Sequence, residues 1–364
     1  MKLKKSMIGL VKQEAAPGDV VFHDDLPIPE IGDDDILVKI RCVSVCTTDT
    51  NDIMSWAAYA QKRVHPPVIL GHEACGDIIE VGKNVTDRKI GDRVAIEPYI
   101  TCGKCYSCTH GMPHLCNNII VWGIGANGGY AEYSRIPAAC TYPIGDDLSY
   151  EAACMLQPNG TGVHSAEVAE PNGKTVLVVG CGSLGLTAIA SCKTFGAKRI
   201  IACDLFDEKL ETSKKMGADV IINTKREDLV SSVLASTDGI GVDVAIDYTG
   251  SGAIYNLELK SIRPKGRLVC VALPTKPITF EDMTDDLIYR EIELTGISGR
   301  LIWKTWEDFE VVMKSPYYKL EYVLGGRYSL TDYKSALAAM REGKPGKMVL
   351  YPDAEDLKNP ENFK

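Results

Sequence analysis

The feature that most restricts the fold of this chain is an alternation of strand-like and helix-like segments between residues 172 and 299. Six short apolar runs, each about as long as one β-strand, are separated by stretches with the apolar spacing of amphipathic helices. The runs cover residues 175–180, 199–203, 219–222, 242–247, 267–272 and 292–297. Strands that alternate with helices form a parallel sheet covered by helices. We therefore predict a doubly wound α/β domain here.

The first of these strands leads into a glycine-rich turn. Thr175–Val179 is followed by the run GCGSLG at 180–185 and then by a helix-like segment. In such a strand–turn–helix unit, Gly180 permits the tight turn, Gly182 lets the backbone approach a pyrophosphate, and Gly185 packs the helix against the strand. The pattern predicts a Rossmann domain that binds a dinucleotide.

An acidic residue indicates which dinucleotide is bound. Asp204 ends the next strand, 19 residues beyond Gly185. A carboxylate at this place binds the adenosine ribose hydroxyls and repels the extra phosphate of NADP, so NAD is predicted. The nearby Lys209 could soften this discrimination. A second interpretation makes Asp204 the cap of the helix that follows, and the two roles are compatible.

Four cysteines form the most specific metal motif. They have the spacing C-x2-C-x2-C-x7-C in a turn-prone segment and are Cys102, Cys105, Cys108 and Cys116. Four thiolates complete the tetrahedral shell of a zinc ion, and the short spacings let one loop surround it. An iron–sulfur cluster also takes four cysteines, but the spacing differs from the common ferredoxin patterns. Because four thiolates leave no open coordination position, we predict a structural zinc.

Residues 1–157 have a different pattern, with short apolar runs separated by glycine and proline, which predicts a β-rich domain. Two of its residues are candidates for a second metal: Cys46 in the run CTTD and His72 in the run GHE. A thiolate and an imidazole, with one or two oxygen ligands, form the open zinc site that catalysis requires. Taken alone, each residue is more often a buried structural group.

Charge and composition exclude several classes of function. The net charge of −9 argues against a nucleic-acid partner, which needs basic patches. The apolar runs are far shorter than the roughly 20 residues of a membrane-spanning helix, and the N-terminal segment does not look like a signal peptide. Thirteen cysteines without an export signal indicate metal ligands and buried thiols rather than disulfides. We expect a cytoplasmic protein without a membrane partner.

The order of these motifs resembles the zinc-containing medium-chain alcohol dehydrogenases. GHEACG at 71–76, Gly82 and IGDRV at 90–94 precede the four-cysteine loop, as in the zinc signature of that family. The resemblance covers nearly the whole chain and is closest to the L-threonine 3-dehydrogenase branch, with sorbitol and other polyol dehydrogenases as near relatives. The stretches shared with that branch include ITCG at 100–103, HLC at 114–116, and GR at 299–300 followed by TW at 305–306.

The resemblance implies a discontinuous domain arrangement. A GroES-like catalytic, zinc-binding domain would comprise residues 1–157 and 300–364, and a Rossmann NAD-binding domain would comprise 158–299. Four more residues would lie along the cofactor: Leu184, Lys209, Leu273 and Ile297. Members of the family form dimers or tetramers through the edge strand of the Rossmann sheet, here 292–297, so a homodimer or homotetramer is expected.

The resemblance also assigns the catalytic centre. Cys46, His72 and Glu73 would be ligands of the catalytic zinc, and Thr48 would be the hydroxyl that takes the substrate proton. Gln157 stands where the family commonly has an acidic residue that approaches the zinc, and an amide is a neutral, weaker oxygen ligand.

Two further departures concern proton transfer and substrate choice. Asn51 replaces the histidine that usually passes the alcohol proton towards solvent, and an amide cannot titrate. Tyr99 replaces a histidine that is linked to substrate choice in threonine dehydrogenases. Together with Gln157, these changes leave the reaction type standing and put threonine itself in doubt.

The predicted function is reversible, NAD-linked oxidation of a secondary alcohol to a ketone at a zinc ion that lowers the pKa of the bound alcohol. For the substrate, the C-terminal resemblance favours a 3-hydroxy amino acid, whereas Tyr99, Asn51 and Gln157 favour a polyol, sugar acid or cyclitol. One alternative is a metal-free quinone or enoyl reductase, which shares the fold but lacks both zinc sites. Another is a non-catalytic relative that keeps the nucleotide site.

Overall fold

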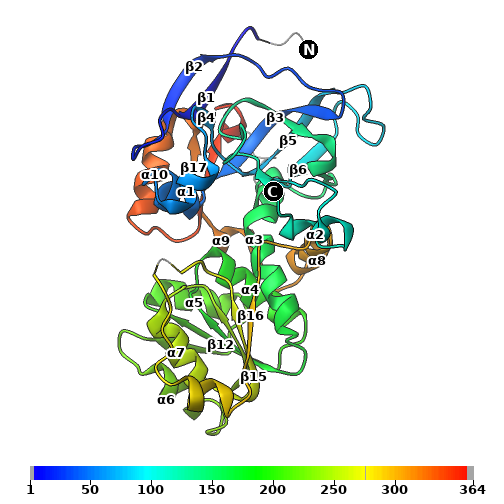
Figure 1. Cartoon of the computed structure of the whole chain (residues 1–364). Coiled ribbons are helices and arrows are strands. Elements are labelled where there is room, and N and C mark those ends of the chain that lie inside the picture. The colour runs from blue at the N-terminus through cyan, green and yellow to red at the C-terminus, as the bar shows by residue number, and fades with distance from the viewer. Residues whose placement is uncertain (1–3, 275, 359–364) are drawn as a thin grey trace. The chain divides into compact units, whose positions relative to one another are not determined.

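The computed structural model describes residues 4–274 and 276–358. Contacts within the chain divide it into two compact units. The first unit extends to Pro158 and resumes at Leu324, and the second unit is Asn159–Val323. In Figure 1 the orange and red segment that begins near residue 324 lies among the blue and cyan strands of the first unit. We describe each unit by itself.

The first unit is built on antiparallel β-structure. Its main sheet has the order β10-β6-β5-β3-β18-β17, with β9 also paired to β3. These strands are β3 (Asp35–Ser44), β5 (Glu73–Val81), β6 (Arg93–Ile96), β9 (Tyr133–Pro137), β10 (Thr141–Pro143), β17 (Leu324–Ser329) and β18 (Lys347–Tyr351). A second sheet contains β1 (Met7–Lys12), β2 (Val21–Leu26) and β4 (Val68–Ile69), and a small ribbon contains β7 (Tyr99–Ile100) and β8 (Ile120–Val121).

Short helices connect and cover these strands. They are η1 (Thr48–Ile53), α1 (Ala58–Arg63), α2 (Tyr106–Thr109), η2 (Pro113–Leu115), η3 (Ala138–Cys140), η5 (Leu330–Asp332), α10 (Tyr333–Arg341) and η6 (Asp356–Lys358). The core of the unit centres on β3, most of whose side chains are buried and which has paired neighbours along both edges. One neighbour is β18, which pairs antiparallel with the end of β3 at Ser44 and Val43.

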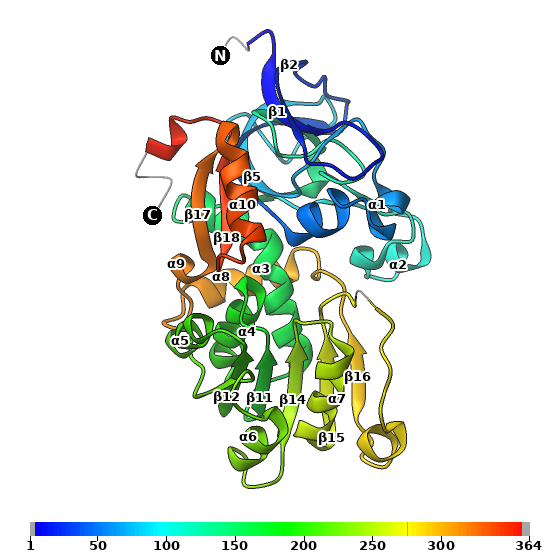
Figure 2. The ribbon, with the colours of Figure 1, turned by 90° about the vertical axis from the view of Figure 1, so that its left-hand side faces the viewer.

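The second unit is a six-stranded sheet in which all paired neighbours are parallel. Its order is β13-β12-β11-β14-β15-β16, which is the Rossmann order. The strands are β11 (Thr175–Val179), β12 (Arg199–Asp204), β13 (Val220–Asn223), β14 (Val242–Asp247), β15 (Ile262–Cys270) and β16 (Glu293–Gly296). Figure 2 shows β12, β11, β14, β15 and β16 in sequence across the sheet. The predicted Rossmann fold is confirmed.

Helices form a layer on each face of this sheet. The helices are α4 (Ser183–Thr194), α5 (Asp207–Lys215), α6 (Leu229–Ala235), α7 (Gly252–Ser261), η4 (Thr284–Ile288), α8 (Lys304–Met313) and α9 (Leu320–Val323). α4 contacts α5, and α6 contacts α7, as expected when the crossovers keep to one face until the strand order reverses and then continue on the other face. Within the described residues, no helix combines the length and apolar character needed to cross a membrane.

The divisions between the units lie at Pro158 and Leu324. The first falls inside the long helix α3 (Tyr150–Ala169). The sequence-based expectation placed the second division at residue 300, but residues 300–323 make their contacts in the second unit. The reason is that α8 buries an apolar face containing Trp306, Phe309 and Val312, and both α8 and α9 pack against α4.

Candidate functional site

The four-cysteine loop folds back on itself. The Sγ atoms of Cys102, Cys105, Cys108 and Cys116 all lie within 4.8 Å of one another. The short helices α2 and η2 bring the third and fourth cysteines back towards the first two. Backbone N–H groups of Cys102 and Asn118 donate to the Cys116 sulfur at 3.3 and 3.4 Å. Such donors stabilise thiolates, which are the form that binds metal.

Local hydrogen bonds shift the thiol pKa values in this loop. Backbone N–H groups of Lys104 and Cys105 lower the pKa of Cys102 to about 6. Burial, together with hydrogen bonds to Cys105 and Cys116, raises the pKa of Cys108 to about 11. One thiol therefore ionises near neutral pH, while another keeps its proton at that pH unless a cation lies beside it.

A second cluster forms where β3 and β5 meet. Candidate ligand atoms of Cys46, His72 and Glu73 lie within 4.8 Å of one another. Cys46 follows the end of β3, and His72 immediately precedes β5, which begins at Glu73. The two strands are antiparallel with Ser44 opposite Glu73, so the register brings together ligands far apart in sequence. His72 and Glu73 are buried, whereas Cys46 is partly exposed.

The carboxylate of Glu73 is held by two donors of the protein. The Lys347 ammonium donates to Oε1 at 2.6 Å, and the Ser44 hydroxyl donates to Oε2. Lys347 begins β18 and is 7% exposed, so the ion pair is buried. Burial alone would lower the pKa of Lys347, but the carboxylate of Glu73 and the Cys46 thiol raise it above its ordinary value.

A buried aspartate faces the histidine. Asp49 Oδ1 lies 3.5 Å from His72 Nδ1, and its Oδ2 accepts the N–H of Cys46 at 3.1 Å and the hydroxyl of Tyr130 at 2.6 Å. A carboxylate on one ring nitrogen orients an imidazole and leaves the other nitrogen for a metal. Burial by itself would lower the pKa of His72, but Asp49 and Cys46 raise it well above its ordinary value. The pocket therefore favours positive charge at this point.

The remaining predicted residues of this region all belong to the first unit but come from different segments of it. Thr48 is half-buried at the start of η1, two residues beyond Cys46, and Asn51 is exposed in the same helical turn. Gln157 is buried on α3. Tyr99 is half-buried in β7.

The nucleotide loop has the backbone that its glycines require. Gly180 has φ +97°, in the left-handed region, and a Cβ on Gly185 would lie 1.9 Å from the Gly180 carbonyl oxygen. Asp204 Oδ2 accepts the N–H of Cys181 at 2.8 Å, and Oδ1 accepts the N–H groups of the two residues that follow it. Asp204 thus ties the end of β12 to the glycine turn, while α5 begins only at Asp207.

The other predicted nucleotide residues lie at the carboxyl edge of the sheet or on the helices that begin there. Leu184 is in the first turn of α4, and Lys209 is in the first turn of α5. Leu273 and Ile297 follow the carboxyl ends of β15 and β16. Ligands of open α/β sheets bind outside this edge.

Comparisons with known proteins identify the family. Residues 32–146 match the alcohol dehydrogenase GroES-like domain, and residues 183–315 match the zinc-binding dehydrogenase domain. An L-threonine 3-dehydrogenase of Caldanaerobacter subterraneus subsp. tengcongensis is 35% identical over 348 residues, 95% of this chain and 99% of the relative. The corresponding enzyme of Pyrococcus horikoshii is 34% identical over the same shares of both chains.

This chain belongs to the zinc-dependent medium-chain alcohol dehydrogenase family. Solved structures agree: rspB of Escherichia coli CFT073, described as an alcohol dehydrogenase complexed with NADH, has a TM-score of 0.86 at 25% identity and covers 96% of this chain and 100% of its own. Galactitol-1-phosphate dehydrogenase of Escherichia coli has the same TM-score and identity, covering 95% of this chain and 100% of its own. The family resemblance found in the sequence is confirmed.

Three further residues lie around the second cluster of this dehydrogenase, and the sequence analysis gave them no role: Asp49, Tyr130 and Lys347. Asp49 stands inside the CTTD run and was open to recognition as a carboxylate close to a ligand. Lys347 directly precedes the apolar run MVLY, which is a weak signal of a buried partner. Tyr130 carries no local signal.

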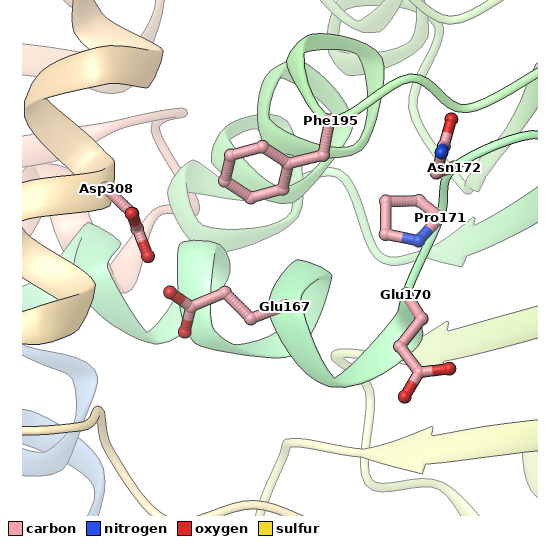
Figure 3. Close-up of a pocket in the computed structure, with 6 residues that line it drawn as sticks. All are labelled: Glu167, Glu170, Pro171, Asn172, Phe195 and Asp308. Carbon is pink, nitrogen blue, oxygen red and sulfur yellow. The ribbon is translucent and has the colours of Figure 1, made fainter.

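A surface hollow of about 350 Å³ in the second unit is separate from the predicted residues. In Figure 3 the carboxylates of Glu167 on α3 and Asp308 on α8 point towards one another beside the ring of Phe195. Burial, followed by the hydrogen bond with Asp308, raises the pKa of Glu167 to about 8. Near neutral pH the Glu167 carboxyl group therefore keeps its proton and shares it with Asp308.

Proposed function

We propose that this chain oxidises a secondary alcohol to a ketone reversibly, with NAD as the hydride acceptor and a zinc ion at Cys46, His72 and Glu73. The observation that carries the proposal is the convergence of a partly exposed thiol, an imidazole and a carboxylate within 4.8 Å. Three protein groups leave a zinc ion an open position for substrate. The family of the chain and the activity of its threonine dehydrogenase relatives support the same conclusion.

The donor set fits zinc. Cys46 offers a thiolate and His72 a nitrogen, which are the ligand types that zinc prefers, and the Asp49 carboxylate faces the other nitrogen of the imidazole at 3.5 Å. Glu73 would be the third ligand, with Lys347 and Ser44 limiting its movement. Bound zinc supplies a positive charge that lowers the pKa of an alcohol oxygen.

Residues of the chain would transfer the proton of the substrate alcohol to water. The hydroxyl of Thr48 accepts the substrate proton at Oγ1 as it releases its own hydroxyl proton. Asn51, which is exposed and cannot titrate, does not pass it on, so we expect water to take the proton from Thr48. Gln157 would approach the metal as a neutral oxygen donor.

NAD would be bound by the second unit. Gly180, Gly182 and Gly185 admit the pyrophosphate to the start of α4, and Asp204 keeps lone pairs for a ribose hydroxyl. Leu184, Lys209, Leu273 and Ile297 would line the rest of the cofactor. A second zinc ion, held by the four-cysteine loop in the first unit, would be structural because its shell is closed.

The favoured substrate is a threonine-like 3-hydroxy amino acid, because the curated relatives described above are L-threonine 3-dehydrogenases. A polyol or its phosphate is the second candidate. It is favoured by Tyr99, Asn51 and Gln157, which depart from the threonine pattern, and by the galactitol-1-phosphate dehydrogenase among the solved neighbours. We expect a homodimer or homotetramer joined along β16, the outer strand of its sheet.

The test is NADH formation by the purified, zinc-replete chain with L-threonine, related hydroxy amino acids, polyols, polyol phosphates and sugar acids. Cys46→Ser should abolish turnover and lose one of two bound zinc ions while binding NADH as the parent does. Cys192→Ala is the matched control, because this buried thiol lies in α4 outside both clusters. Full activity of Cys46→Ser would contradict the mechanism, and turnover confined to a polyol would select the second substrate class.

A further inference from the structure

Tyr130 is a buried side chain that contacts both segments carrying the second cluster. It is 1% exposed, and its hydroxyl donates to Asp49 Oδ2 at 2.6 Å. Its backbone N–H donates to the carbonyl of Leu70 at 2.9 Å, in the segment that leads to His72. Its ring packs on Gly71, where an added Cβ would lie 2.5 Å from the ring carbon Cδ1. One tyrosine therefore joins the Cys46 loop to the start of β5.

Asp49 transmits this contact to the ligands. The oxygen that accepts the tyrosine hydroxyl also accepts the N–H of Cys46 at 3.1 Å. The other oxygen faces His72 Nδ1 at 3.5 Å. The orientation of this single carboxylate thus decides how both ligands are presented.

The tyrosine hydroxyl is what fixes that orientation. A carboxylate torsion is broad, so Asp49 turns easily unless its oxygens are held. Hydrogen bonds to an ionised acceptor are stronger than neutral ones, and this one is shielded from water because Asp49 is fully buried. Without the hydroxyl, Oδ2 keeps only the N–H of Cys46. The imidazole of His72 then loses a fixed partner for Nδ1.

We propose that Tyr130 is a positioning residue for the metal centre, acting through Asp49 on Cys46 and His72. The inference rests on the proposed zinc site. Gly71 is part of the same arrangement, since its φ of +92° and missing side chain make room for the ring. Loss of a residue behind a metal ligand typically weakens metal binding by about 10- to 100-fold.

The experiment compares Tyr130→Phe with Tyr333→Phe. Tyr333 is also buried in the first unit, and its hydroxyl donates to the carbonyl of Val20 at 3.2 Å, so its loss removes a similar bond elsewhere. Zinc release from the loaded proteins to a colorimetric chelator is followed over time. We expect Tyr130→Phe to release one of its two zinc ions at least about 10-fold faster, with the four-cysteine zinc unchanged as an internal reference. Tyr333→Phe should release both ions at the parental rates.

The path through Asp49 is tested in an Asp49→Asn background. Adding Tyr130→Phe there should accelerate zinc release no further, because the charged acceptor is already gone. Parental release by Tyr130→Phe, or an undiminished effect in the Asp49→Asn background, would overturn the inference. A parent chain that holds zinc only in the four-cysteine loop would instead overturn the proposed function, and this inference with it.

Discussion

Replacing Lys347 with methionine removes the positive half of the buried ion pair beside the second cluster. The Nζ–Oε1 distance to Glu73 is 2.6 Å, and the two side chains are 9% and 1% exposed. Removing one partner of such a pair costs about 3–5 kcal/mol, because the remaining charge stays buried without compensation. Ser44 still donates to the other oxygen, which favours the lower end of that range. We expect a loss of about 3 kcal/mol, roughly a hundredfold in the unfolding constant.

The assay is urea denaturation followed by circular dichroism in excess chelator, so that metal binding does not contribute to stability. The control is Lys39→Met, because the Lys39–Asp353 pair in the same sheet is partly exposed at 19% and 35% and should contribute about 1 kcal/mol or less. The double variant Glu73→Gln, Lys347→Met should regain most of the loss, since neither half of this ion pair is left as an unpaired charge. A loss below about 1 kcal/mol in Lys347→Met, or no recovery in the double variant, would refute the reasoning.

The same substitution should strengthen zinc binding. Lys347 is a positive charge next to Glu73, so its removal leaves the negative ligands less compensated and raises their attraction for a cation. The expected result is lower stability together with slower zinc release. Lower stability with faster release would mean that the substitution had disrupted the site and not simply removed a charge.

Three further predictions concern the second unit. The pKa of Glu167 in the folded protein, about 8, lies above its ordinary value of 4.5, so the folded state binds one proton more and the free energy of unfolding falls as pH rises between these values. In urea titrations from pH 5 to 9, Glu167→Gln should make this fall less steep. An unchanged slope would contradict the shared proton. A Cβ on Gly182 meets no heavy atom of the described chain within 4 Å, so Gly182→Ala should keep the melting temperature within a few degrees. It should weaken NADH binding at least about tenfold in a fluorescence titration, because the methyl group occupies the space through which the backbone approaches the pyrophosphate. Parental affinity would place the pyrophosphate elsewhere. Glu258 is buried with neither carboxyl oxygen hydrogen-bonded in the described part of the chain, and burial raises its pKa well above the ordinary value. Glu258→Leu should therefore raise the free energy of unfolding by about 1–3 kcal/mol in denaturant titrations, most at alkaline pH. A loss of stability would show that the carboxyl group has a partner.

The sheet of the second unit was predictable because parallel strands that are covered on both faces have nearly continuous apolar sequences. The prediction was poorest for β15, which begins at Ile262 instead of 267. Residues between these points include a proline and Lys265, whose φ is +57°, and the pairing with β14 shifts register there. A strand that contains an irregularity loses its regular apolar pattern at that point, so the sequence indicates only the second half of β15.

The candidate metal ligands of the second cluster were recognisable for a different reason. Cys46, His72 and Glu73 stand in short local runs whose order matches a family signature, and β3–β5 pairing then brings them together. The groups that hold them were not recognisable, since they come from remote segments. Lys347 lies 274 residues from Glu73, and Tyr130 lies 81 residues from Asp49. Such partners are set by strand register and packing, which a single sequence does not record.

Charge explains why this particular set of groups is assembled. With the thiol ionised, Cys46, Asp49 and Glu73 carry three negative charges, and the ammonium of Lys347 cancels one of them. Asp49 and Glu73 are fully or almost fully buried, so the remaining two charges are costly without a counter-ion. A divalent cation would balance them, and Gln157, which is neutral, adds no further negative charge on α3. The same negative groups raise the pKa values of His72 and Lys347, because a proton on either side chain also offsets their charge.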